Sequence, residues 1–121
     1  MMKQYVNPIA YVGLRPEVQR MSRIKVRTDD PERIIMAVCI ALDLDRADML
    51  SRNRRHEITE ARSICYRIMR DLDMKLTYIG RFFGLHHSTV IYGLNTYDDM
   101  MKFDDDFKIK FYKVKRVLEI W

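Results

Sequence analysis

The sequence predicts an all-α fold: a helix-turn-helix bundle of about six helices that follows an N-terminal arm. After residue 30, apolar residues recur at intervals of three and four, which is the spacing of one helix face. Residues 76–95 show this spacing in two short segments separated by Gly84, and glycine tolerates the positive φ with which many helices end. Two short helices joined by a tight turn are typical of helix-turn-helix proteins.

The length and composition of the chain agree with one domain. Its 121 residues are 48% hydrophobic, which is enough to build a core. The sequence has no run of 18 apolar residues, and its N-terminus lacks the apolar stretch of a signal peptide. We therefore expect a cytoplasmic protein that does not cross a membrane, with residues 1–28 as the arm and residues 29–121 as the helical domain.

The arm is the part of the chain that is hardest to interpret. Pro8, Gly13 and Pro16 interrupt any long helix, and SRIKVRT at residues 22–28 alternates between polar and apolar residues, as a short strand or an extended segment does. The arm either packs on the domain or becomes ordered only on DNA or on a protein partner. The sequence leaves both alternatives open.

The domain begins with a strong helix start. An aspartate pair precedes Pro31, and an aspartate cap followed by proline predicts a helix that runs to about Leu42. Asp45 opens a second, very short helix that ends near Leu50. The first of these helices is expected to bury Ile34, Ile35, Val38, Cys39 and Leu42.

A basic loop, SRNRRH at residues 51–56, leads into a long helix predicted over residues 57–72. The buried face of this helix carries Ile58, Ala61, Cys65, Ile68 and Leu72. Arg62, Tyr66 and Arg70 are spaced by four and share another face. We expect that face to be an exposed ridge that contacts phosphates, rather than an ordinary solvated surface.

The helix-turn-helix comprises a first helix at residues 76–83 and a recognition helix from about residue 88 to residue 101. The start of the recognition helix is placed where a DNA major groove can receive it. The side chains there can all hydrogen-bond to bases or phosphates, and none is needed to fill a core. They are His86, His87, Ser88 and Thr89.

Positive charge gathers around these elements. The formal net charge is +5, and residues 52–91 hold eight Lys and Arg, four Asp and Glu, and all three histidines. Residues 92–121 hold six residues of each sign. A basic face of this kind attracts phosphate and speeds the encounter with DNA.

Other chemistry is weakly supported. Cys39 and Cys65 lie in apolar helical patterns without zinc-ligand spacing, so we expect buried free thiols. The adjacent pair His86–His87 has no third ligand nearby, so we expect no metal and no other cofactor. Aspartates 104–106 are expected to cap a last helix rather than to form a catalytic site, so we do not expect an enzyme. That helix should bury Phe107, Phe111, Val114, Leu118 and Trp121.

Three blocks of the sequence together carry a resemblance: ADMLS at 47–51, RNRRHEITEARSI at 52–64 and LTYIGRFFGLHHSTV at 76–90. Their order and spacing resemble the C-terminal DNA-binding domain (domain IV) of the bacterial replication initiator DnaA. That family has an ADLLS-like helix, a basic loop, a helix with AR(Q/S), and LPEIG..FGGRDHTTV. The resemblance covers about residues 32–121 and implies a DnaA domain IV-like, TrpR-like fold. It also implies double-stranded DNA as the partner, in replication initiation or its regulation.

The resemblance implies contacts with both grooves of DNA. Arg54 of the basic loop would enter the minor groove, where narrow, A·T-rich DNA attracts arginine. His86, His87 and Ser88, followed by Thr89, would read the major groove. The expected phosphate contacts are Arg62, Arg70, Lys75 and Arg81.

Departures from the family's pattern bear on specificity. The turn is one residue shorter, Leu85 replaces an arginine, and His86 replaces an aspartate. An aspartate accepts a hydrogen bond from cytosine, whereas a neutral histidine can also donate, which would favour guanine. No G-x-x-x-x-G-K-[ST] motif is present, so we expect no ATP site in this chain and a stand-alone DNA reader of a phage, a mobile element or a regulator.

Two other classes of function remain open. The bihelical unit can serve a protein-interaction module or a transcriptional regulator, and residues 1–28 can bind a protein partner. A single-strand or RNA binder is less favoured, because few aromatic residues are available for stacking on bases apart from Tyr66, Tyr78 and Tyr92.

Overall fold

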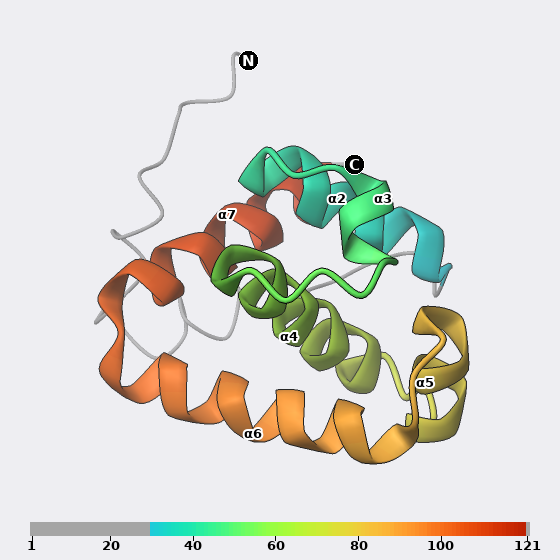
Figure 1. Cartoon of the computed structure of the whole chain (residues 1–121). Helices are drawn as coiled ribbons and strands as arrows, with labels where there is room; N and C mark the ends of the chain where they lie inside the picture. The colour runs from blue at the N-terminus through green and yellow to red at the C-terminus, as the bar shows by residue number, and fades with distance from the viewer. Residues whose placement is uncertain (1–29, 121) are drawn as a thin grey trace.

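The structure is a computed structural model that describes residues 30–120, and these residues fold into six helices (Figure 1). The helices are α2 (Pro31–Leu42), α3 (Arg46–Met49), α4 (His56–Asp71), α5 (Leu76–Phe83), α6 (His87–Phe103) and α7 (Asp105–Ile120). The predicted all-α helix-turn-helix bundle is confirmed. Residues 1–29 and Trp121 lie outside the described residues, so the division into arm and domain and the burial of Trp121 stay predictions.

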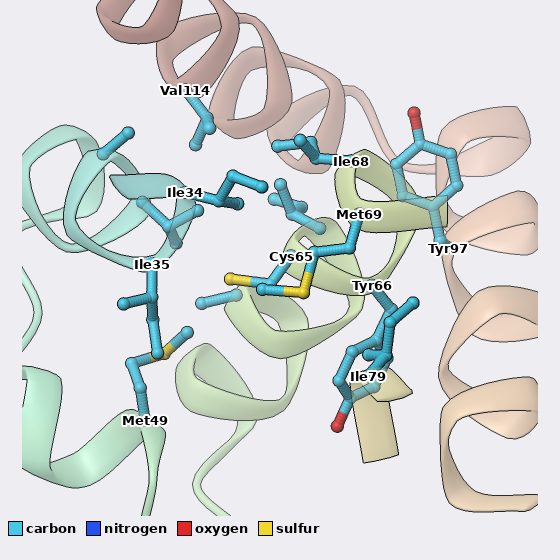
Figure 2. Close-up of a cluster of buried hydrophobic side chains, with 14 of the residues drawn as sticks. Ile34, Ile35, Met49, Cys65, Tyr66, Ile68, Met69, Ile79, Tyr97 and Val114 are labelled. Atoms are coloured by element: carbon cyan, nitrogen blue, oxygen red, sulfur yellow. The ribbon is translucent and has the colours of Figure 1, made fainter. Parts of the chain in front are cut away.

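Helix α4 lies at the centre of the bundle, with α2 and α7 on one side and α6 along the other (Figure 1). Buried side chains from these helices form one core, in which Ile34 of α2, Cys65 of α4 and Val114 of α7 lie close together (Figure 2). The core continues toward α5 and α6 through Ile79 and Tyr97. Each large aliphatic side chain buried there stabilises the fold by about 1.5–3 kcal/mol relative to exposure.

Aspartate caps fix three of the helix starts, as the sequence predicts. Asp30 accepts a hydrogen bond from the Glu32 amide at 3.0 Å, and Asp45 accepts one from the Ala47 amide at 3.2 Å. Asp104 accepts one from the Phe107 amide at 3.1 Å, at the start of α7. Each bond satisfies an amide that has no partner within its own helix.

Two leucines that were expected to be fully buried are only partly buried. Leu42 is the last residue of α2, and the chain turns away at Asp43 in the left-handed conformation, with φ of 56°. Leu72 is the C-cap of α4. Both residues pack against the core from the end of a helix. The chain leaves the helix there, so one side of each leucine remains open to solvent.

Cys39 and Cys65 are buried free thiols, as predicted. Burial raises the pKa of both thiols, which keeps them protonated and unreactive at neutral pH. Across residues 30–120 no helix has the length and apolar character needed to span a membrane. The same residues contain no cluster of three or more His, Cys, Asp or Glu side chains suited to a metal ion.

Candidate nucleic-acid interface

A tight turn joins α5 to α6 (Figure 1), and two glycines make it possible. Gly84 ends α5 in the left-handed conformation, with φ of 70°, which confirms its predicted role. The Leu85 amide donates to the Gly80 carbonyl at 2.7 Å, and a Cβ on Gly80 would lie only 2.7 Å from the Leu85 carbonyl oxygen. The close approach of turn and helix fixes where α6 begins.

The side chains at the start of α6 point outward. His86, His87, Ser88 and Thr89 are all exposed, so none of them fills the core. Helix α6 begins at His87, one residue earlier than predicted, because His86 is its N-cap: Nδ1 accepts the Ser88 amide at 3.1 Å. Sequence reasoning missed this cap, because histidine is not among the preferred capping residues.

The cap determines which hydrogen bond His86 can make outward. Nδ1 can accept the Ser88 amide only while it carries no proton, and the neutral ring then carries its proton on Nε2. The Oγ of Ser88 lies 2.9 Å from the same Nδ1. The His87 ring stacks beside His86, with the ring centroids 4.3 Å apart. The hydrogen bonding therefore assigns Nε2 as a donor.

The basic loop presents two arginines beside these histidines. Arg52 and Arg54 are exposed, and neither makes an ion pair or hydrogen bond with another residue that the structure describes. Arg55 differs, because it pairs with Asp48 at 3.3 Å and Glu57 at 3.9 Å. Arg54 therefore has the exposure that a DNA contact needs, and Arg52 is a second candidate that sequence reasoning did not single out.

One groove joins the basic loop to the start of α6. It has a volume of about 1080 Å³, and its walls include Arg52 and Arg54 as well as His86, Ser88 and Thr89. These residues come from separate blocks of the sequence. The fold thus places the two predicted groove-reading elements on one concave surface.

The single buried carboxylate that this groove's wall contains is paired with a lysine. Glu60 is only 5% exposed, and it binds Nζ of Lys110 from α7 at 2.6 Å. Nε2 of His56 lies 3.0 Å from its other oxygen. Because Lys110 balances its charge, Glu60 does not make the groove repellent to phosphate.

Arg62 is buried, which corrects the expectation of an exposed phosphate contact. It is 8% exposed, and its guanidinium donates to four backbone carbonyls at 2.6–3.0 Å. These carbonyls belong to Asp48, Met49, Ser51 and Asn53. The basic loop folds over this side chain, so Arg62 faces the protein and not the solvent.

The predicted ridge on α4 is therefore wrong. Tyr66 is 3% exposed and packs edge-on against Phe83 of α5, with ring centroids 5.2 Å apart. Its burial raises the pKa of its hydroxyl to about 12. Arg70 is exposed, and its guanidinium donates to the Met74 carbonyl at 2.9 Å. Helices α5 and α6 cover Tyr66, and the basic loop covers Arg62, so two of the three residues that periodicity alone placed outside are buried.

The remaining predicted contacts are exposed but do not line the groove. They are His87, Arg70, Lys75 and Arg81. Tyr92 does line the groove and is 74% exposed, although sequence reasoning did not propose it as a contact with duplex DNA. Tyr92 lies four residues after Ser88, which places both residues on one face of α6. This spacing could have indicated Tyr92 as a contact from the sequence alone.

Comparison with known proteins agrees with this geometry. Residues 31–96 match the family described as "Bacterial dnaA protein helix-turn-helix", a range that runs from α2 into α6 and includes the basic loop and the turn. The chain is also similar to proteins named "Chromosomal replication initiator protein DnaA" in several bacteria.

Three of these relatives show the extent of the similarity. The chain is 30% identical over 86 residues to the protein of Leptospira biflexa, which is 70% of this chain and 20% of the relative. It is 31% identical to the protein of Gloeobacter violaceus, with coverage of 94% and 26%, and 35% identical to that of Oleidesulfovibrio alaskensis, with coverage of 54% and 14%. The chain spans about a quarter or less of these relatives' length. By the extent of the family match, this chain belongs to the bacterial DnaA helix-turn-helix family.

Proposed function

We propose that this chain binds double-stranded DNA, with the start of α6 in the major groove and Arg54 in the adjacent minor groove. The observation that carries the proposal is the shared groove, which contains the exposed polar start of α6 and two loop arginines that pair with no other residue in the range 30–120. A helix start with outward hydrogen-bonding side chains suits base edges, and an arginine suits the negative potential of a narrow minor groove. One duplex can meet both elements together.

We also propose that this binding serves replication initiation or its regulation. The support is membership of the DnaA helix-turn-helix family and the similarity to proteins named as chromosomal replication initiators. The proposed activity is recognition without catalysis. Its sequence preference would be set mainly by His86, His87 and Ser88, with Thr89 beside them.

Residues around the groove would anchor the duplex by its phosphates. Arg70 of α4, Lys75 at the start of α5 and Arg81 of α5 are exposed cations outside the groove, and Arg52 lies in the groove itself. Contacts of this kind supply affinity for any sequence and weaken as salt rises, because bound counterions are released.

The test is selection of duplexes from a random pool by the full chain, followed by fluorescence anisotropy. We expect a selected duplex to bind on the order of 10³-fold more tightly than a random one, with affinity that falls as salt rises. Absence of duplex binding at low salt would refute the proposal and favour a protein-interaction module. If the chain prefers single-stranded over double-stranded DNA, it is a single-strand or RNA binder instead.

A charge-matched comparison shows whether the groove carries the binding. Arg52→Ala combined with Arg54→Ala should lower the preference for the selected duplex at least about tenfold, and leave the part that α6 provides. Lys102→Ala combined with Lys113→Ala removes two exposed cations from α6 and α7, outside the groove, and should leave that preference unchanged. Equal effects of the two changes would mean that net charge, and not the groove, determines binding.

A further inference from the structure

The guanidinium of Arg62 is nearly saturated by the backbone of the segment that precedes α4. Nε donates to the Met49 carbonyl at 3.0 Å, and Nη1 donates to the Asn53 carbonyl at 2.7 Å. Nη2 donates to the carbonyls of Asp48 at 3.0 Å and Ser51 at 2.6 Å. A guanidinium has five N–H donors, so these four bonds leave one donor for any other partner.

The four carbonyls come from two neighbouring parts of the chain. Asp48 and Met49 end the short helix α3, where carbonyls lack partners within the helix, whereas Ser51 and Asn53 belong to the basic loop. Arg62 therefore ties both parts to α4. Turning its guanidinium outward to a phosphate would break all four bonds, which favours the inward position. Of the four carbonyls, that of Asp48 also accepts from the Ser51 amide and Oγ.

We propose that Arg62 is a positioning residue, which holds the basic loop so that Arg54 projects into the groove beside α6. Asn53, whose carbonyl Arg62 binds, directly precedes Arg54. Bonds inside the loop act in the same direction: Ser51 Oγ accepts the Asn53 amide at 3.0 Å, and Asn53 Oδ1 accepts the Arg55 amide at 2.9 Å. The inference rests on the proposed function, because it gives Arg62 an effect on DNA binding that acts through Arg54.

The variant Arg62→Lys separates positioning from a phosphate contact. Lysine keeps the charge and can bind a phosphate, but it cannot span four carbonyls in a plane. We expect it to bind the selected duplex about tenfold more weakly than wild type, as Arg54→Ala does. In an Arg54→Ala background it should cause no further loss. Binding like wild type, or additive losses, would overturn the inference.

Discrimination between base pairs separates positioning from a general loss of stability. Arg54→Ala identifies the base pairs that Arg54 reads. When one of those base pairs is replaced in the duplex, the affinity of this variant does not change, whereas the affinity of the wild type falls. Arg62→Lys should lose discrimination at those same pairs and keep it at the pairs that α6 reads. Equal loss of discrimination at all pairs, measured well below the unfolding transition, contradicts the inference.

A second variant covers the case in which Arg62→Lys does not fold. Ser51→Ala combined with Asn53→Ala removes the loop's own side-chain bonds but keeps Arg62 and every cation. We expect this variant to bind the selected duplex about threefold more weakly than the wild type. The loss of discrimination should be confined to the base pairs that Arg54 reads. Wild-type discrimination in this variant would contradict the inference.

Amide hydrogen exchange, measured on the protein without DNA, tests the positioning role of Arg62 separately from the proposed binding of duplex DNA. The amides of Ser51, Asn53 and Arg55 are hydrogen-bonded in the loop, and Arg62→Lys should speed their exchange at least about tenfold. Unchanged exchange overturns the positioning role. If exchange rises but the wild type binds no duplex, the loop is held as inferred and the proposed function fails.

Discussion

The ring of Tyr66 in α4 packs directly against Gly93 in α6. A Cβ at Gly93 would lie 2.5 Å from two carbons of that ring, which is closer than real Cβ contacts come. Tyr66 cannot move aside easily, because it is 3% exposed and packs against Phe83. The crossing of α4 and α6, and with it the wall of the groove, therefore requires a position without a side chain.

Gly93→Ala should lower the free energy of unfolding by about 1–3 kcal/mol, because overpacking outweighs the better helix propensity of alanine. Urea denaturation measures this loss. Tyr66→Leu combined with Gly93→Ala should recover part of it, because the smaller side chain relieves the clash. Asn95→Ala, an exposed change on the same helix, is the control and should have little effect. A stabilised Gly93→Ala variant would contradict this packing.

The stability of the fold should fall as pH rises from 10 to 12. Burial raises the pKa of Tyr66 from an ordinary value near 10 to about 12, so within this window the unfolded chain loses a proton that the folded chain keeps. The contribution is fully present below pH 10 and is lost above pH 12, at about 1.4 kcal/mol per pH unit between them. Tyr66→Phe should show a correspondingly smaller loss of unfolding free energy between pH 10 and pH 11.

Local signals were sufficient to predict most of the fold. Aspartate caps, the glycine at the turn and apolar spacing act over a few residues, so they can be recognised without knowing what packs against them. The starts of α2, α3 and α7 and the end of α5 are accordingly close to prediction. The buried face of α4 was harder to predict, because periodicity shows which residues share a face but not which neighbouring helix covers it.

In the candidate site, too, local features could be predicted from the sequence, and contacts between distant segments could not. The outward position of His86 to Thr89 follows from the turn, which is local. The burial of Arg62 follows from four backbone carbonyls up to 14 residues away in sequence, and no spacing rule indicates such bonds. The pairing of Arg55 with Asp48 and Glu57, which distinguishes it from Arg54, also depends on how the loop folds.

Gly80→Ala should disturb both the fold and the proposed DNA binding. The new Cβ would meet the Leu85 carbonyl oxygen at 2.7 Å and the His87 nitrogen at 3.3 Å, and these backbone atoms cannot move without shifting the start of α6. We expect a loss of about 1–3 kcal/mol in unfolding free energy. Chemical denaturation and duplex titration of one preparation measure both effects. An unchanged affinity would mean that the position of α6 relative to α5 is unimportant.

Arg54 and Arg55 form a matched pair for testing the groove, because they are adjacent and carry the same charge. Arg54→Ala should cost about 1–3 kcal/mol of binding to a selected duplex, since its guanidinium lines the groove. Arg55→Ala removes a cation that is already paired with Asp48 and Glu57 and should cost under about 0.5 kcal/mol. Anisotropy titrations at one salt concentration compare them. Equal losses would show that charge, and not position, matters.

The capping bond of His86 predicts which base it prefers. With Nδ1 occupied by the Ser88 amide, the ring offers a donor at Nε2, and the major-groove edge of guanine presents two acceptors. His86→Asp keeps a good N-cap but offers only acceptors, which suit the amino group of cytosine. We expect the preference at one base pair to move from guanine toward cytosine, by about 1–3 kcal/mol, in selections from a random pool.

The variant His86→Ala separates this base contact from the cap. It removes both, so it should lower the unfolding free energy by about 0.5–2 kcal/mol and lose the preference at that base pair without acquiring a new one. His86→Asp should stay close to wild type in stability, so its altered preference cannot be attributed to a frayed helix. If wild type and His86→Asp select the same base, Nε2 of His86 does not face a base edge, and the specificity of α6 must come from His87 and Ser88.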